Sequence, residues 1–193
     1  MIITLIGYRG TGKSTVARPL AARLGWTAVD ADAELERRAG RSIRDIFASD
    51  GEPEFRRLER ETLVDLLQRD RLVIAAGGGA ILNPQTRADF GASGPVVWLQ
   101  ASVETIEQRL YGDPTTTDRR PNLTASGGRQ EIEQMLKVRE PYYRETASLI
   151  VATDRPLPGH AGCDAATLAE LVEYLVTELS PQIGESQFGG AGQ

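Results

Sequence analysis

The hydrophobic residues of the chain fall into short apolar runs that alternate with segments of helical period. Short runs rich in β-branched residues are typical of buried strands. The runs cover residues 2–6, 26–29, 72–76, 95–99 and 148–153. Because helical segments lie between them, we expect an α/β fold in which helices cover a five-stranded parallel sheet.

Helices are expected where apolar residues recur every three or four positions. They cover residues 16–24, 33–39, 43–49, 53–68, 84–90, 102–110, 130–138 and 165–179. Ser42 can cap the third of these helices, and Pro53 suits the first turn of the fourth, after a break at Gly51. The Gly-, Gln- and Ser-rich segment 181–193 is expected to be a disordered tail.

The composition narrows the class of protein. The chain has 193 residues and a net charge of −5, which argues against a general nucleic-acid binder. Cys163 is the only cysteine, so an internal disulfide is impossible and a reducing cytosol is expected. His160 shares a loop with Cys163, but two potential ligands do not make a zinc site. We expect no membrane span, since no apolar run is long enough, and no leader peptide, since the chain enters a strand at once.

A phosphate-binding motif follows the first expected strand. The segment GYRGTGKST at 7–15 matches G-x-x-x-x-G-K-[ST] between a strand and a helix, which disfavours the alternative of a glycine-rich turn that binds nothing. The loop amides form an anion-binding nest, Lys13 would reach the β- and γ-phosphates, and the Ser14 hydroxyl would bind Mg²⁺. The residues expected to bind nucleotide are Gly10, Thr11, Gly12, Lys13, Ser14 and Thr15. The motif predicts a nucleoside triphosphate and leaves the acceptor open.

Two acids follow the second expected strand, at the sheet edge where ligands of parallel sheets bind. Asp30 and Asp32 are two residues apart, so in extended chain they project to the same side. One can face the metal and the other a substrate hydroxyl. The alternative is that Asp32 only caps a helix that begins near Ala33. Because the strand at 72–76 carries no terminal acid, Asp30 is the candidate for Mg²⁺.

Further candidates lie in a glycine loop and in a long connection. Gly77–Gly79 follow a buried strand and suit a substrate-facing loop, although a flexible turn is the alternative. Arg56 lies off the apolar face of its helix, and an ordinary ion pair with Glu52 or Glu59 explains it as well. Residues 112–128 suit a lid that carries an arginine to the reacting phosphate, or else a disordered surface loop.

Together these segments resemble the shikimate kinase family, which has the nucleoside-monophosphate-kinase-like P-loop fold. The similar segments are GYRGTGKST at 7–15, VDAD at 29–32, SIRDIF at 42–47, GEPEFR at 51–56, AGGG at 76–79, RPNL at 120–123 and REPYY at 139–143. The resemblance implies a three-layer α/β/α domain over residues 1–180, with a mobile lid at about 111–128. It also implies a cytoplasmic enzyme, which we expect to be monomeric, that uses Mg²⁺ and ATP to phosphorylate the 3-hydroxyl of shikimate for chorismate biosynthesis.

The resemblance also implies a role for each matching residue. Lys13 holds phosphates, Ser14 and Asp30 serve Mg²⁺, and Asp32 engages the reacting hydroxyl as a base or as an orienting group. Arg120 is the lid arginine. The residues implied to bind shikimate are Asp32, Arg56, Gly77, Gly78, Gly79 and Arg139, with both arginines directed at its carboxylate. Arg109 and Arg155 resemble positions that flank adenine, although an apparent insertion at 154–164 departs from the family pattern there.

Two other readings compete with this one. A kinase of gluconate or of a nucleoside monophosphate would keep the P-loop and change the acceptor. A gluconate kinase should lack the combination of Phe55-Arg56 with the triple glycine. A nucleotide acceptor would not need the two carboxylate-directed arginines, Arg56 and Arg139. A P-loop regulator without an acceptor would need neither these arginines nor Asp32.

Overall fold

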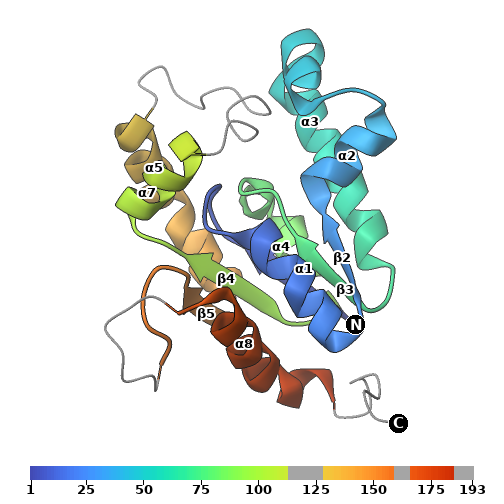
Figure 1. Ribbon diagram of the computed structural model, residues 1–193. Helices are drawn as coiled ribbons and strands as arrows, with labels where there is room; N and C mark the ends of the chain where they lie inside the picture. Colours follow the sequence, from blue (N-terminus) through green and yellow to red (C-terminus); the bar gives the residue numbers. More distant parts are fainter. Residues whose placement is uncertain (113–127, 159–165, 185–193) are drawn as a thin grey trace.

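The computed structural model describes residues 1–112, 128–158 and 166–184. The strands are β1 (Ile2–Ile6), β2 (Thr27–Asp30), β3 (Leu72–Ala75), β4 (Val96–Gln100) and β5 (Leu149–Ala152). The helices are α1 (Lys13–Leu24), α2 (Ala31–Ala39), α3 (Ile43–Leu67), α4 (Pro84–Ser93), α5 (Val103–Gly112), α7 (Gly128–Thr146) and α8 (Leu168–Ile183), with a 3₁₀ turn η1 (Ala80–Leu82). Figure 1 shows their arrangement.

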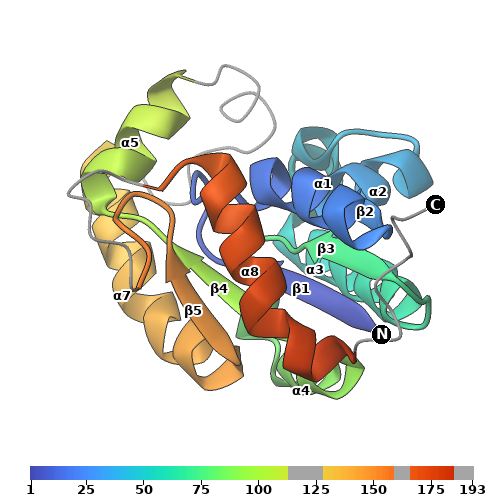
Figure 2. The ribbon, with the colours of Figure 1, turned by 60° about the horizontal axis from the view of Figure 1, so that its bottom comes forward.

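The five strands form one parallel sheet in the order β2-β3-β1-β4-β5. Side chains alternate between its two faces, as the pleat requires. Ile3 and Leu5 of β1 pack with α1 and α8, whereas Ile2 and Ile6 pack with residues of α3, α4 and α7. Figure 2 shows α1 and α8 in front of the sheet and α4 and α7 behind it. The predicted three-layer α/β/α fold with five parallel strands is therefore confirmed.

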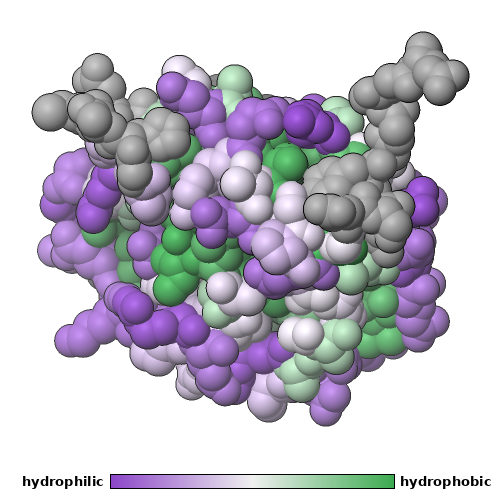
Figure 3. All heavy atoms as spheres, turned by 90° about the horizontal axis from the view of Figure 1, so that it is seen from below, coloured by the Kyte–Doolittle hydropathy of each residue, from purple (hydrophilic) through white to green (hydrophobic). Residues whose placement is uncertain are grey.

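The face of the molecule drawn in Figure 3 is mostly polar. Seen from below, hydrophilic residues predominate and the hydrophobic ones lie in separate patches (Figure 3). No helix within the described ranges is both long and apolar enough to cross a membrane.

Several helices differ in length from the sequence prediction. The expected helices at 43–49 and 53–68 are the two halves of α3, which is broken at Gly51 (φ 79°, ψ −179°) as predicted. Helix α7 was expected to end near residue 138 but continues through Pro141 to Thr146. A proline removes one backbone hydrogen bond, here to the carbonyl of the exposed residue Lys137. The buried residues Arg139 and Tyr143 on either side of Pro141 hold the helix in place.

The last helix is longer than predicted, and the predicted lid is described only at its two ends. Helix α8 runs to Ile183, four residues past its expected end, because Ile183 is buried in the core beside α1. The first residues of the predicted tail are therefore helical. The ends of the predicted lid belong to α5 and α7. Its middle, with Arg120, lies outside the described residues, as do His160, Cys163 and the rest of the tail.

Candidate active site

The P-loop connects β1 to α1 and needs its glycines. Gly7, Gly10 and Gly12 have positive φ angles of 142°, 79° and 91°, a region that L-residues rarely adopt. A side chain at Gly7 would also collide with the sheet, since its Cβ would lie 2.4 Å from the carbonyl oxygen of Leu99. Gly12 occupies the N-cap position of α1, so the free amides of the first turn face the loop.

The two reactive side chains of the motif lie where the sequence places them. Lys13 Nζ donates hydrogen bonds to the carbonyl oxygens of Gly7 and Tyr8, both at 2.8 Å, so it folds over the loop. The Ser14 hydroxyl donates to Asp30 Oδ2 at 2.5 Å. A hydroxyl and a carboxylate are the hard oxygen donors that Mg²⁺ prefers. Ser14 and Asp30 therefore fit a magnesium site.

Of the two acids at the end of β2, it is Asp30 and not Asp32 that caps the next helix. Helix α2 begins at Ala31, and its cap is Asp30, whose Oδ1 accepts from the amides of Asp32 (3.0 Å) and Ala33 (3.2 Å). The alternative that Asp32 caps this helix is therefore wrong. Asp32 lies in the first turn of α2 and lines the cleft described next.

A cleft of about 580 Å³ joins these elements at the carboxyl ends of the strands. Its walls come from the P-loop, the β2–α2 corner, the glycine loop after β3 and the end of α5. The lining residues are Arg9, Gly10, Gly12, Lys13, Ser14, Thr15, Asp30, Asp32, Ile43, Ala75, Ala76, Gly78, Arg109, Leu110 and Gly112. This volume suits a small-molecule site at the position where open parallel sheets bind ligands.

Arg139 reaches the glycine loop from α7. Its Nη1 donates to the carbonyl oxygen of Gly78 at 3.3 Å, and the Tyr143 hydroxyl donates to the same oxygen at 2.6 Å. The guanidinium also lies 5.7 Å from the centre of the Tyr8 ring. Arg139 is only 5% exposed, yet within residues 1–112, 128–158 and 166–184 no carboxylate lies within ion-pair distance of it. A buried cation in this state favours an anionic ligand.

Arg56 approaches the same loop from α3. It is ion-paired with Glu52 (3.0 Å) and Glu59 (2.8 Å), the alternative that the sequence also allowed. Its side chain is only 26% exposed. A Cβ on Gly79 would lie 2.6 Å from Arg56 Nη1. Since Gly79 has an ordinary φ of −102°, a side chain there would strain no backbone but would push the Arg56 guanidinium out of its position. Arg56 and Arg139 thus flank the glycine loop without themselves lining the cleft.

A family model described as shikimate kinase matches residues 9–179. The chain belongs to the shikimate kinase family. Among relatives, shikimate kinase from Thermobifida fusca is 44% identical over 160 residues, which cover 83% of this chain and 90% of the relative. Shikimate kinase from Rhodopirellula baltica is 44% identical over 149 residues, 77% of this chain and 80% of the relative.

Solved structures of shikimate kinases are similar to this chain over most of its length. Shikimate kinase from Acinetobacter baumannii in complex with shikimate superposes with a TM-score of 0.80 at 35% identity, and the match covers 95% of each chain. A gluconokinase from Sinorhizobium meliloti, at 18% identity and a TM-score of 0.50, is similar in fold alone. The predicted family and enzyme class, an ATP-using phosphotransferase of the shikimate kinase type, are confirmed.

The two candidate adenine arginines of this chain lie in different places. Arg109 donates to the carbonyl oxygen of Gly10 (3.2 Å) and to both oxygens of Thr153 (3.0 and 3.1 Å), and it lines the cleft beside the P-loop. The Arg155 side chain is 71% exposed and does not line the cleft. It borders a separate cavity of about 130 Å³ behind the P-loop.

Sequence reasoning missed one buried ion pair. Arg9, at a variable position of the P-loop motif, donates to Glu131 of α7, and Glu131 has no exposed surface. The two residues are 122 positions apart. The sequence shows Glu131 two helical turns before Arg139. Glutamates are too common on helices for this spacing to predict a buried ion pair.

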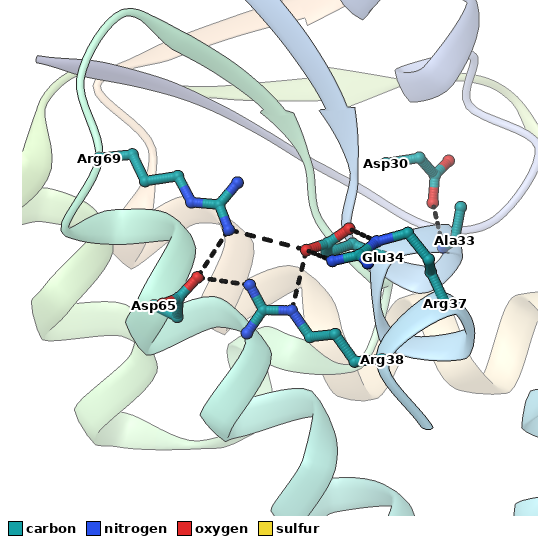
Figure 4. A network of polar contacts seen from close by, with 7 residues as sticks. All are labelled: Asp30, Ala33, Glu34, Arg37, Arg38, Asp65 and Arg69. Carbon is teal, nitrogen blue, oxygen red and sulfur yellow. Dashed lines mark hydrogen bonds and ion pairs between the residues drawn. The ribbon is translucent and has the colours of Figure 1, made fainter. Parts of the chain in front are cut away.

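A polar network fixes α2, the helix that Asp30 caps and that carries Asp32. Glu34 of α2 accepts from Arg37 (2.7 Å) and Arg38 (2.8 Å), and Arg38 and Arg69 both bind Asp65 of α3 (Figure 4). Hydrogen bonds from the two α2 arginines lower the pKa of Glu34 to about 2. The network holds α2 against α3 and so restrains Asp32 in the first turn of α2.

Proposed function

We propose that this chain transfers the γ-phosphoryl group of ATP to the 3-hydroxyl of shikimate, giving shikimate 3-phosphate and ADP. One observation supports the choice of acceptor: Arg139 is buried beside the glycine loop, and no carboxylate among the described residues lies within ion-pair distance of it. It calls for a small anion with a planar carboxylate, for which a guanidinium is the matching partner. Shikimate is such an acid, and a related enzyme in the same fold holds it.

The phosphate half of the cleft is formed by the P-loop. The amides of the loop and of the first α1 turn would surround the β- and γ-phosphates, and Lys13 would leave its carbonyl partners to bind the γ-phosphate. Gly10, Thr11, Gly12 and Thr15 supply the surrounding backbone. Since phosphoryl transfer depends mostly on position and charge, this preorganised loop is the main catalytic element.

Ser14 and Asp30 would hold Mg²⁺, because their oxygen atoms already meet at the edge of the cleft. The ion, when bound, neutralises charge on the phosphates. Asp30 is fixed for this role by its second oxygen, which caps α2.

Asp32 would engage the 3-hydroxyl of shikimate. It lies in the first turn of α2 and lines the same cleft as Lys13 and Ser14 of the P-loop. Arg139 and Arg56 would bind the carboxylate of the acceptor, with the backbone of Gly77, Gly78 and Gly79 between them. The distance between the acid and the arginines then sets which hydroxyl reaches the phosphate.

The remaining assignments follow the family pattern. We propose that Arg120 reaches the transferred phosphate on closure of the lid. Arg109, beside Gly10, suits the adenine end of the nucleotide, and Arg155 would have to move to join it. We further propose a cytoplasmic monomer that acts on small molecules and binds no nucleic acid, in keeping with the net charge of −5.

The test is ADP release with Mg·ATP across shikimate, quinate, gluconate, AMP and no acceptor. We expect release with shikimate and a product heavier by one phosphoryl group in mass spectrometry. Titration of Mg²⁺ after chelation should restore the rate. Equal release in every well would indicate an ATPase, and release with another acceptor would overturn the assignment of Arg56 and Arg139.

A further inference from the structure

Arg9 and Glu131 form the buried ion pair between the P-loop and α7. The Arg9 side chain is 17% exposed, and it lines the cleft, whereas Glu131 is fully buried. A buried carboxylate that loses its cation is destabilising by several kcal/mol. The pair therefore strongly restrains the position of the first turns of α7 relative to the P-loop.

The same helix carries the proposed acceptor arginine. Arg139 lies eight residues after Glu131 on α7, and it contacts Gly78. The guanidinium groups of Arg9 and Arg139 each lie 5.7 Å from the centre of the Tyr8 ring. Tyr8 of the P-loop is fully buried beside both arginines. Two adjacent P-loop residues thus contact two sites on α7, one at each end of the segment that leads to Arg139.

The glycine loop completes this arrangement. A Cβ on Gly78 would lie 3.3 Å from the carbonyl oxygen of Gly7, 3.5 Å from the amide nitrogen of Arg9 and 3.7 Å from Arg139 Nη1. The P-loop, the glycine loop and α7 therefore pack directly on one another. A shift of α7 along the P-loop would move Arg139 relative to Gly78 and to the phosphates.

We propose that Arg9 and Glu131 are a pair of positioning residues for the acceptor. The pair fixes α7 on the P-loop and so holds Arg139 at the level of Gly78, where the carboxylate of shikimate is bound. The inference rests on the proposed function, since it takes Arg139 as the carboxylate-binding residue. It assigns neither residue a part in the chemical step.

A simple electrostatic role makes the opposite prediction. Glu131→Gln leaves the positive charge of Arg9 uncompensated beside Arg139. If charge alone mattered, that added cation would attract the acceptor carboxylate and lower the KM for shikimate. If position matters, Arg139 is displaced and the KM rises.

The experiment measures initial rates with Glu131→Gln, Arg9→Ala, Glu131→Ala and the Arg9→Ala/Glu131→Ala double variant. We expect each single variant to raise the KM for shikimate about tenfold while the KM for ATP stays within about twofold. The KM for shikimate of the double variant should be no higher than that of the more impaired single variant, because the two residues act as one unit. The double variant removes both charges of this ion pair together, so it reports on the pair even if a single variant fails to fold.

A matched control is the ion pair between Arg23 and Glu173, which joins α1 to α8 away from the cleft. Glu173→Gln should leave both KM values unchanged. Calorimetric binding of ADP confirms a folded P-loop in each variant. An unchanged or lower KM for shikimate in Glu131→Gln, or independent multiplying effects in the double variant, would overturn the proposal. Failure of the wild-type enzyme to phosphorylate shikimate would instead overturn the proposed function.

Discussion

Arg139→Ala tests the acceptor site most directly. The substitution removes a buried guanidinium that donates to the Gly78 carbonyl at 3.3 Å and packs over the Tyr8 ring. In the complex this guanidinium would meet the carboxylate of shikimate with little competing water, since it is only 5% exposed. Loss of one partner of a buried, hydrogen-bonded charge pair weakens binding by about 2–4 kcal/mol.

The magnitude translates into a large and specific change in affinity. A loss of about 2–4 kcal/mol raises the Kd for shikimate by roughly 30- to 1000-fold. The affinity for ADP should stay within about threefold, because Arg139 does not line the phosphate part of the cleft. Arg139→Lys keeps the charge but loses the planar fork, so it should recover only part of the affinity.

Folding gives an independent measure of the same site. Because no carboxylate in the described chain offsets Arg139, removal of its charge relieves a desolvation cost and limits the loss of stability. Shikimate should raise the Tm of the wild-type protein by mass action and leave the variant unchanged. Calorimetric titration that shows the same shikimate Kd in both proteins would refute the assignment.

Four other substitutions probe the rest of the cleft and its support. Lys13→Ala should abolish turnover in a folded protein, and near-normal activity would refute the P-loop role. Asp32→Asn should lower kcat strongly, whereas a change in KM alone would make Asp32 a binding residue. Gly79→Ala places a Cβ 2.6 Å from Arg56 Nη1, so the KM for shikimate should rise and that for ATP should not. Glu34 has its pKa lowered from 4.5 to about 2, so its stabilisation is complete above about pH 4.5 and is lost as the pH falls toward 2. Glu34→Gln should lower the free energy of unfolding at pH 7 by about 1 kcal/mol. Its urea-unfolding midpoint should also vary less between about pH 4.5 and pH 2 than that of the wild type. The same pH dependence in both proteins would contradict this.

Local patterns predicted the strand, the loop and the helix that build the P-loop. The P-loop motif, its strand and its helix are contiguous in sequence, so backbone conformation and chemistry coincide in one segment. Asp30 was found because it ends a strand beside the loop. Asp30 also caps α2, whereas the sequence offered Asp32 as the alternative cap. The start of a helix is the least certain feature of a sequence pattern.

The proposed acceptor half of the site, formed by the glycine loop with Arg56 and Arg139, depends on tertiary contacts. Sequence spacing does not reveal such contacts. Pro141 predicts a helix end, but packing of Arg139 and Tyr143 against the glycine loop keeps α7 continuous. The ion pairs of Arg56 with Glu52 and Glu59 follow from helical spacing. Its approach to Gly79 does not, because it depends on how α3 packs against β3 and η1.

The charges around the acceptor half also bear on which acceptor fits. Arg56 shares its charge with Glu52 and Glu59, and Arg9 shares its charge with Glu131. Of the three arginines, Arg139 is thus the one that no carboxylate of the described chain offsets. One uncompensated guanidinium matches a single carboxylate, whereas a nucleoside monophosphate would bring nearly two negative charges to the same loop. The balance of charges therefore favours a monocarboxylate such as shikimate over a phosphorylated acceptor, for a reason independent of family resemblance.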